Sequence, residues 1–374
     1  MSNKKIIISG GGTGGHIFPA IAIANALKKI DLTIELLFVG AEGRIEMEKV
    51  PKAGYEIEGL WISGFERRLT ARNLSFPFKL MSSLWKSRKI LKRFQPQVVV
   101  GVGGYASGPL LKMATMMGIP ALIQEQNSYP GITNRLLAKQ VKKVCVAYDG
   151  LERFFDKNTI VMTGNPVRKD IIELYDSKQT AIEAEAKRRA AVEYFGLNPD
   201  KRALFITAGS GGARGVRDGI AEYLQDLVGK DVQLIWQAGK NYIEDTEVMA
   251  SPFKDTVKAM AFVDRMDLAY IAADAIVARA GATTISELCI VGKPVILMPS
   301  PYVTEDHQTA NALAMVKKGA ALMVKDKEAR EELGKALDVV LFDENQRKSL
   351  GEGIRKLAVT DAADRIAREV LGLF

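Results

Sequence analysis

Glycine-rich loops that follow short apolar runs are the first features of this sequence that could do chemistry. Gly10–Gly15 follows the apolar run Lys5–Ser9 and leads directly into His16, one of two histidines in 374 residues. Glycine lets the backbone approach a phosphate closely, and the helix that we expect to begin near Pro19 would add a favourable field of roughly 0.3 to 1 kcal/mol. The pattern predicts a phosphate-binding loop.

His16 is the residue best suited to move a proton. An imidazole beside such a loop can take the proton from an attacking hydroxyl, which typically contributes about 10² to 10⁴ in rate. A histidine that only begins a helix is the alternative. The loop spacing also fits the GxGxxG pattern of dinucleotide-binding proteins, but the next apolar run, Glu35–Val39, does not end in the expected acid.

Two further loops in the first half also follow apolar runs. Gly103, Gly104 and Tyr105 repeat the arrangement of the first loop, and a tight turn that needs glycine only for its backbone angles is the alternative reading. Gln124–Asn127 offers amides and the carboxylate of Glu125, which suit sugar hydroxyls. Together they favour a site for a polyanion and a sugar at one sheet edge.

The second half contains another glycine loop and two charged residues suited to a nucleotide. Ser210 lies in the loop Ala208–Ala213 and can donate to a phosphate from its hydroxyl and its backbone. Arg168 follows the turn at 164–166 and could reach the same anion, although an ordinary surface arginine is an equal alternative. Glu287 follows a predicted helix N-terminus, and a carboxylate can accept both hydroxyls of a ribose.

A polar loop with the second histidine follows the apolar run Val295–Met298. It contains Asp306, His307 and Gln308. No Asp-x-Asp pair occurs in the sequence, so a metal-dependent diphosphate site of that kind is disfavoured and we expect no metal. Helix N-termini and arginine would then neutralise a leaving diphosphate.

The net charge of +8 comes from one segment. Between Trp61 and Pro96 there are nine basic residues and one acid, which account for the whole excess. Phe78, Met81, Trp85 and Leu91 recur there at near-helical spacing, which predicts a helix that can lie on an anionic lipid surface, where each basic residue contributes about 1 kcal/mol. A core-facing helix with a solvated basic side is the alternative, and no nucleic-acid-binding module accompanies the segment.

The elements that must position these residues repeat one order of apolar run, glycine loop and helical pattern. It occurs twice in each half, as is typical of doubly wound parallel sheets. With the chain length, it predicts an α/β fold of two Rossmann-like domains, at residues 1–164 and 165–354, with a C-terminal helix in 355–374 that packs back on the first domain. The predicted strands include Lys5–Ser9, Val98–Val100, Ala203–Thr207 and Ala275–Ala278.

The bulk composition, 47% apolar and 26% charged, is that of a globular protein. The sequence has neither a signal-peptide region nor an apolar stretch near the roughly 18 residues of a membrane span, so we expect the protein to stay where it is made. Cys145 and Cys289 lie far apart in apolar stretches, which predicts reduced, buried thiols and no disulfide.

Taken together, the motifs resemble those of the MurG glycosyltransferases of bacterial peptidoglycan synthesis. The resemblance covers essentially the whole chain, through residues 10–16, 103–109, 124–127, 130–131, 164–168, 209–213, 281–287 and 306–311. It implies the GT-B fold, in which two Rossmann-like domains face each other across a cleft. It also implies transfer of N-acetylglucosamine from UDP-N-acetylglucosamine to the muramoyl sugar of an undecaprenyl-diphosphate-linked acceptor, lipid I, with inversion and without a cofactor, to form lipid II.

The resemblance assigns roles to individual residues. Arg168 and Ser210 would meet the donor diphosphate, Glu287 its ribose, Gln308 its sugar, and the backbone of Val263 its uracil. The whole set implied for substrate binding is Thr13, Gly14, Gly15, Asn127, Arg168, Ser210, Val263, Ala282, Thr283, Glu287 and Gln308.

For the acceptor, the resemblance implies that the loop at Gly103, Gly104 and Tyr105 cradles its diphosphate. The basic aromatic segment would dock on the anionic cytoplasmic face of the inner membrane, without any nucleic acid as partner. The residues implied for docking are Trp61, Phe65, Arg68, Arg72, Phe78, Lys79 and Trp85.

The expected mechanism is a direct displacement by the acceptor 4-hydroxyl. His16 would remove its proton, and Glu125 could orient or replace that base, so the identity of the base stays open. Two residues depart from the family pattern, since Gln124 stands where many members have His and Ala280 where they have Ser.

Overall fold

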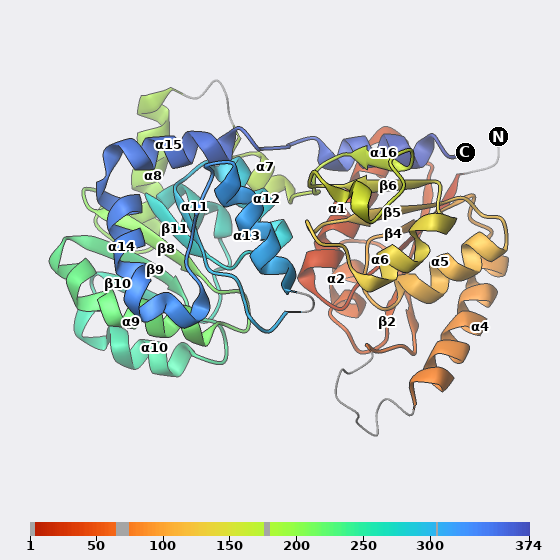
Figure 1. The fold of residues 1–374 in the computed structure, drawn as a ribbon, viewed down its shortest axis with the longest axis horizontal. Coiled ribbons are helices and arrows are strands. Elements are labelled where there is room, and N and C mark those ends of the chain that lie inside the picture. Colours follow the sequence, from red (N-terminus) through yellow and green to blue (C-terminus); the bar gives the residue numbers. More distant parts are fainter. Residues whose placement is uncertain (1–3, 65–74, 176–179, 304–305) are drawn as a thin grey trace. The chain divides into compact units, whose positions relative to one another are not determined.

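The computed structural model describes residues 4–64, 75–175, 180–303 and 306–374 (Figure 1). The chain divides into two compact units by its internal contacts. One comprises Met1–Arg168 with Asp361–Phe374, and the other comprises Lys169–Thr360. The first division therefore lies a few residues after the expected position at 164, and the return to the first unit begins at Asp361 instead of 355.

Seven parallel strands form the sheet of the first unit in the described residues, in the order β3-β2-β1-β4-β5-β6-β7. They are short apolar runs, as suits strands that are covered on both faces. Their bounds are β1 Lys5–Ser9, β2 Glu35–Ala41, β3 Glu56–Leu60, β4 Val98–Gly101, β5 Ala121–Glu125, β6 Lys143–Val146 and β7 Ile160–Met162.

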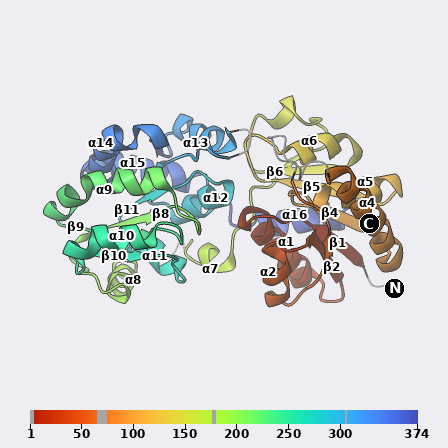
Figure 2. The same cartoon turned by 90° about the horizontal axis from the view of Figure 1, so that it is seen from below.

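Helices cover both faces of this sheet. Successive residues of β1 point to opposite sides, so that Ile7 packs in one core with the helices α4 and α5, while Ile6 and Ile8 pack in the other with α1 and α16. Figure 2 shows α16 beside α1, from the two ends of the sequence. The helices of this unit are α1 Gly14–Ile30, α2 Glu46–Lys52, α4 Phe76–Phe94, α5 Ser107–Met116, α6 Ile132–Leu137 and α16 Ala362–Leu371, with short 3₁₀ turns at Ala138–Gln140 and Leu151–Arg153.

The second unit repeats this architecture with six parallel strands among its described residues, in the order β10-β9-β8-β11-β12-β13. The strands are β8 Arg202–Thr207, β9 Val232–Gln237, β10 Val257–Met260, β11 Ala275–Ala278, β12 Val295–Leu297 and β13 Leu322–Met323. The helices are α7 Lys169–Ile172, α8 Ala181–Tyr194, α9 Arg214–Gly229, α10 Ile243–Ala250, α11 Met266–Ala272, α12 Ala282–Val291, α13 His307–Lys317, α14 Ala329–Phe342 and α15 Glu344–Arg355, with 3₁₀ turns at Ser251–Phe253 and Asp326–Glu328. Both sheets thus have the doubly wound Rossmann order, which confirms the fold class predicted from the sequence.

The strand order places the predicted loops at special positions. In each sheet the order reverses between the first strand and its later neighbour, β1 and β4 in one unit, β8 and β11 in the other. Ligands of doubly wound proteins bind outside the carboxyl ends of the strands at such a switch point. The four glycine loops noted in the sequence follow these four strands.

Two local expectations were wrong. The helix α1 begins at Gly14, well before Pro19. Gly14 and Gly15 both adopt helical backbone, and Pro19 removes only one intrahelical hydrogen bond. Leu91 does not share a face with Phe78, Met81 and Trp85: it is buried in the core while those three are exposed. At about 100° per residue, the thirteen residues from Phe78 place Leu91 roughly 140° around the helix axis from it.

Candidate functional site

The first and second glycine loops pack directly against each other in the first unit. The Gly11 N–H donates to the Gly103 carbonyl at 3.3 Å. Gly104 has φ +86°, and a Cβ there would overlap the backbone of Gly11. A larger residue at 104 would push the loops apart, so glycine is needed here for close approach as well as for its backbone angle.

His16 lies where these two loops meet. Its Nδ1 is 3.1 Å from the Thr13 hydroxyl, which precedes α1 as its N-cap. A Cβ at Gly103 would be 2.9 Å from His16 Nε2, so the ring edge lies directly over the second loop. The side chain is partly exposed. The structure thus places His16 in the first turn of α1, orients its ring through Thr13, and leaves Nε2 beside the second loop.

A buried carboxylate under the first loop was missed by sequence reasoning. Glu46 is fully buried and accepts hydrogen bonds from the N–H groups of Gly12, at 2.8 Å, and Ala41, at 3.0 Å. The absence of side chains at Gly11 and Gly40 makes room for it. Because the Gly12 N–H already donates to Glu46, the first loop is fixed internally at that position.

Glu125 is held inside the loop that follows β5. Its Oε1 accepts from the backbone N–H and the side-chain amide of Asn127, and its Oε2 accepts from the Gly131 N–H and the Asn134 amide, at 2.8 to 3.2 Å. The residue is 1% exposed. Burial raises the pKa of this carboxyl, and hydrogen bonds from Asn127, Asn134 and Gly131 oppose the shift. This environment suits a residue that fixes the loop better than a base that must reach a substrate.

Buried amides join this loop to its neighbours. Gln124 donates to Asn165 at 3.0 Å, and Asn165 donates to the Gln126 carbonyl at 3.0 Å. Gln126 donates to the Val102 carbonyl at 2.7 Å and also to Gln124. The loops after β4, β5 and β7 therefore form one hydrogen-bonded layer. Gln124, which stands where many relatives have His, serves as a link in it.

In the second unit, Ser210 lies in an exposed loop after β8. The loop is shaped by Gly209 and Gly212, both with φ near +80°, and the Ser210 carbonyl accepts from the Lys240 N–H at 3.1 Å. A Cβ at Gly212 would overlap the Ala238 carbonyl, so the loops after β8 and β9 are packed backbone to backbone, as in the first unit. The Ser210 hydroxyl is at the carboxyl edge, just before α9.

Glu287 lies on α12, after β11. Its Oε2 accepts from the Tyr270 hydroxyl at 3.0 Å, and Tyr270 in turn packs edge-on against Phe205 of the core. Ala282 and Thr283 form the first turn of the same helix. Tyr270 was not found from the sequence, because it lies seventeen residues upstream and meets Glu287 only through packing.

The loops after β11 and β12 are fixed by Arg279, which was also missed. Its Nη1 donates to the Met298 carbonyl at 2.9 Å and pairs with Asp326 at 2.5 Å, both side chains being largely buried. Beside it, Gln308 accepts from the Ser300 N–H at 2.8 Å, which fixes the start of α13.

Two other predicted donor residues can be placed. The Val263 N–H already donates to the Gln237 side chain at 3.2 Å, which leaves the Val263 carbonyl as its possible contact with a base. Arg168 is the last residue of the first unit before α7 and is partly exposed. The predicted residues thus form two sets, one at the carboxyl edge of each sheet.

The helix α4 carries three of the predicted docking residues, Phe78, Lys79 and Trp85, while Trp61 directly follows β3. Phe78, Met81 and Trp85 are 73%, 69% and 62% exposed and form one stripe. Lys89 lies over the Trp85 ring at 3.9 Å, and Lys79 over that of Trp61 at 5.7 Å. Three further predicted residues, Phe65, Arg68 and Arg72, lie outside the described residues.

Within the ranges that the structure describes, none of the helices is both long and apolar enough to cross a bilayer.

The sequence of this chain is similar to known glycosyltransferases over nearly its whole length. Residues 6–146 match the glycosyltransferase family 28 N-terminal domain, and residues 203–366 match its C-terminal domain. The chain is 52% identical over 374 residues to the UDP-N-acetylglucosamine--N-acetylmuramyl-(pentapeptide) pyrophosphoryl-undecaprenol N-acetylglucosamine transferase of Phocaeicola vulgatus, covering 99% of this chain and 96% of the relative.

Solved structures are similar as well. The crystal structure of Acinetobacter baumannii MurG matches with a TM-score of 0.77 and 25% identity, covering 99% of both chains. UDP-GlcNAc 2-epimerase from Neisseria meningitidis, bound to UDP-GlcNAc, matches with a TM-score of 0.67 and 14% identity over 99% of this chain and all of the other, which indicates a shared fold only. By sequence and by fold, the chain belongs to the MurG family of N-acetylglucosamine transferases, within glycosyltransferase family 28.

Proposed function

We propose that this protein transfers N-acetylglucosamine from UDP-N-acetylglucosamine to the 4-hydroxyl of the muramoyl sugar of undecaprenyl-diphosphate-linked lipid I, which yields lipid II. The observation that carries the proposal is the pair of closely packed glycine loops at the switch point of the first sheet, with His16 between them. The naming of the relatives as this transferase supports the choice of substrates.

The donor would bind mainly to the second unit, at residues 165–354 in the division expected from the sequence. Ser210 and the N-terminal turn of α12 are suited to its diphosphate, since hydroxyls and helix N-termini stabilise anions. Glu287, whose Oε2 accepts from the Tyr270 hydroxyl, would accept from the ribose. Arg168 would meet the diphosphate, while Thr13, Gly14, Gly15, Asn127 and Gln308 would meet the sugar, as the family resemblance implies.

The reaction would be a direct displacement with inversion. The acceptor oxygen forms a bond to the anomeric carbon as the bond from that carbon to the diphosphate breaks, and UDP leaves with the electron pair. His16 takes the proton of the acceptor hydroxyl, and Thr13 orients the ring. We assign Glu125 to holding the Gln126–Gly131 loop, because four N–H groups already occupy its oxygens.

The acceptor would approach from the membrane through the first unit. The buried face of α4 packs on α5, and α5 begins at the second glycine loop, so the exposed stripe of α4 is connected mechanically to Gly103, Gly104 and Tyr105. We propose that this stripe, with Trp61, Lys79 and Lys89, docks on the cytoplasmic face of the inner membrane, and that the second loop receives the acceptor diphosphate.

A transfer assay tests the proposal. With radiolabelled UDP-N-acetylglucosamine and the lipid-linked acceptor, label should enter the lipid fraction and UDP should be released in equal amount, with or without a chelator of divalent ions. Free sugar or an epimerised donor formed without acceptor would argue for hydrolysis or epimerisation instead. Thermal stabilisation by NADH and not by UDP-N-acetylglucosamine would favour the dinucleotide alternative.

A further inference from the structure

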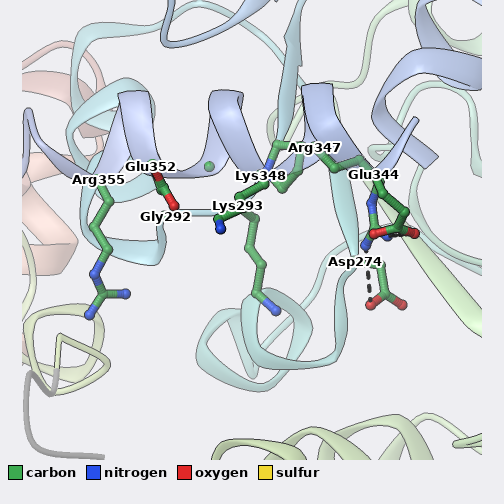
Figure 3. A pocket seen from close by; sticks show the side chains of 10 residues that line it. Asp274, Gly292, Lys293, Glu344, Arg347, Lys348, Glu352 and Arg355 are labelled. Atoms are coloured by element: carbon green, nitrogen blue, oxygen red, sulfur yellow. Dashed lines mark hydrogen bonds and ion pairs between the residues drawn. The ribbon is translucent and has the colours of Figure 1, made fainter. Parts of the chain in front are cut away.

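The second unit contains a cavity of about 350 Å³ that the proposed reaction does not use. It lies between α15 and the turn that joins α12 to β12, and we call it the α15 cavity (Figure 3). Two of its lining residues, Asp274 and Pro294, directly precede β11 and β12. The cavity is therefore at the amino edge of the sheet, whereas Ser210 and α12's first turn are at the carboxyl edge.

The acids of the α15 cavity are largely neutralised by arginine. Asp274 accepts from Arg188 at 2.7 Å, and Arg347 is 4.0 Å from its other oxygen. Glu344 pairs with Arg202 and with Arg347, each at 2.8 Å. Figure 3 shows the Arg347–Asp274 pair at one end of the cavity. Little negative charge is left over from these two acids to balance the remaining cations.

Three more cations line the cavity without an ion pair to any residue in the described part of the chain. They are Lys293, Lys348 and Arg355. Arg355 packs its guanidinium on the Tyr175 ring at 4.8 Å, and Figure 3 shows Lys293 and Arg355 pointing to the same side of α15. Glu352 is the remaining acid of the lining, so cations are in excess.

The enclosure of Lys293 makes this excess costly. Burial lowers the pKa of its ammonium; Asp274 opposes the shift, and Arg188 and Arg347 add to it. The Arg347 Nε is also buried without a hydrogen-bond partner among the described residues. Enclosed charges and donors without partners destabilise a protein unless something binds them.

The carboxyl end of α12 does not balance these cations. The helix ends at Val291, with Gly292 as its C-cap, and its dipole presents about half a negative charge there. Three cations, set against Glu352 and this half charge, leave an excess of about one and a half positive charges. A ligand with a concentrated negative charge would supply the difference.

We propose that the α15 cavity binds a small phosphate-bearing anion, held by Lys293, Lys348 and Arg355. Phosphate oxygens accept several charge-assisted hydrogen bonds at once, and cations on two separate elements can contact one such group from different sides. The site is independent of the donor site and of the proposed function, because it needs no residue of either glycine loop.

Titration of the full chain with inorganic diphosphate tests this inference. The donor site is first saturated with UDP, so that diphosphate binding that persists reports another site. We expect calorimetry to show persistent binding that weakens roughly tenfold or more in Lys293→Gln and in Arg355→Gln. Lys335→Gln removes an exposed lysine of α14 that pairs with Glu332 and should leave the affinity unchanged. Orthophosphate in place of diphosphate shows whether one phosphate group suffices.

Thermal unfolding keeps the test decisive if Lys293→Gln alters folding. Diphosphate should raise the Tm of the wild type and of Lys335→Gln, with UDP present, and should raise it much less in Lys293→Gln and in the more exposed Lys348→Gln. The proposal is overturned if UDP abolishes all diphosphate binding, or if all four proteins respond equally.

Discussion

His16 and Glu125 were both candidates for the base, and their surroundings separate them. His16 is partly exposed, touches two loops and has one ring nitrogen oriented by Thr13. Glu125 is enclosed and engaged by four N–H groups. A base must come within hydrogen-bond distance of the hydroxyl that it deprotonates, so geometry is considered before pKa. On this criterion His16 is the better candidate.

Replacing His16 by Ala should lower the rate of sugar transfer by about 10² to 10⁴. The dissociation constant of UDP should change little, because the proposed nucleotide contacts, apart from Arg168, lie in the second unit. Initial rates with radiolabelled donor and calorimetry with UDP measure the two effects separately. Thr13→Val, which removes only the orienting hydroxyl, should cost less. Turnover retained within a few-fold in His16→Ala would remove this residue from the role.

The carboxyl of Glu125 should make stability depend on pH. Its pKa is raised by burial above the usual 4.5, so the folded protein holds this proton more tightly than the unfolded chain. Its contribution is therefore present below about pH 4.5 and is lost as pH rises through the folded value. The stability of the wild type relative to Glu125→Gln should fall over that interval in denaturant titrations. A stability difference between the two proteins that does not change with pH would contradict a raised pKa for Glu125.

Glu46→Gln tests the carboxylate under the first loop. Glutamine keeps the size but offers only one acceptor to the Gly12 and Ala41 N–H groups, which should lower the free energy of unfolding by about 1 to 3 kcal/mol. Chemical denaturation measures it. Glu48→Gln, on the exposed side of the same helix, is the matched control and should have little effect. Equal losses in the two variants would show that Glu46 does not hold the loop.

Among the elements, α4 both packs in the core of the first unit and exposes large apolar side chains. Ile90 and Leu91 bury one face in the core, while Phe78 and Trp85 remain exposed on another. A helix that only stabilises the unit has no need of large exposed apolar side chains beside lysines. Binding of α4 to another surface would explain why this stripe is apolar and exposed.

Changing Phe78 and Trp85 together to Ser should weaken binding to anionic vesicles strongly and binding to neutral vesicles less. The transfer of water-soluble acceptor analogues should be nearly unchanged, since the core face of α4 is kept. Co-sedimentation with vesicles of defined composition measures binding. Leu32→Ser removes a comparably exposed apolar side chain elsewhere in the same unit and should have no effect. Equal loss in both variants would reject docking through α4.

The strands could be predicted well from the sequence, but the hydrogen-bond partners that hold the site residues could not. Continuous apolar runs such as Lys5–Ser9 and Ala275–Ala278 match β1 and β11, because strands covered on both faces need apolar residues throughout. The start of α1 was missed since glycine tolerates both loop and helix. Glu46 and Tyr270 act through contacts made only when distant segments pack, so no local pattern identifies them.

For the whole molecule, the fold by itself does not specify the reaction. A UDP-GlcNAc 2-epimerase shares the two-sheet architecture at 14% identity, and a MurG shares it at 25%. What the fold supplies is a pair of switch points with loops suited to phosphates. The choice between transfer and epimerisation depends on side chains in those loops, which is why the proposals above are tested residue by residue.

The two cysteines should report on the two units separately. Cys145 is in the core of the first and Cys289 in α12 of the second, and burial raises the pKa of each thiol to about 12. Neither should react with a thiol reagent in the native protein, and each should react when its own unit opens. Labelling of Cys145→Ser and Cys289→Ser during denaturant titration measures this. Rapid native labelling would contradict the burial.

The packing of α16 on α1 has a consequence for synthesis on the ribosome. Ile366, Ala367 and Val370 complete the core that covers one face of the first sheet, yet they are translated after the entire second unit. Until they emerge, the nascent first unit exposes the apolar surface that α16 will cover, although domains generally fold in order of synthesis. The first unit begins to fold first but is completed last. A chaperone that shields apolar surfaces would therefore have to cover this surface until the second unit has been synthesised.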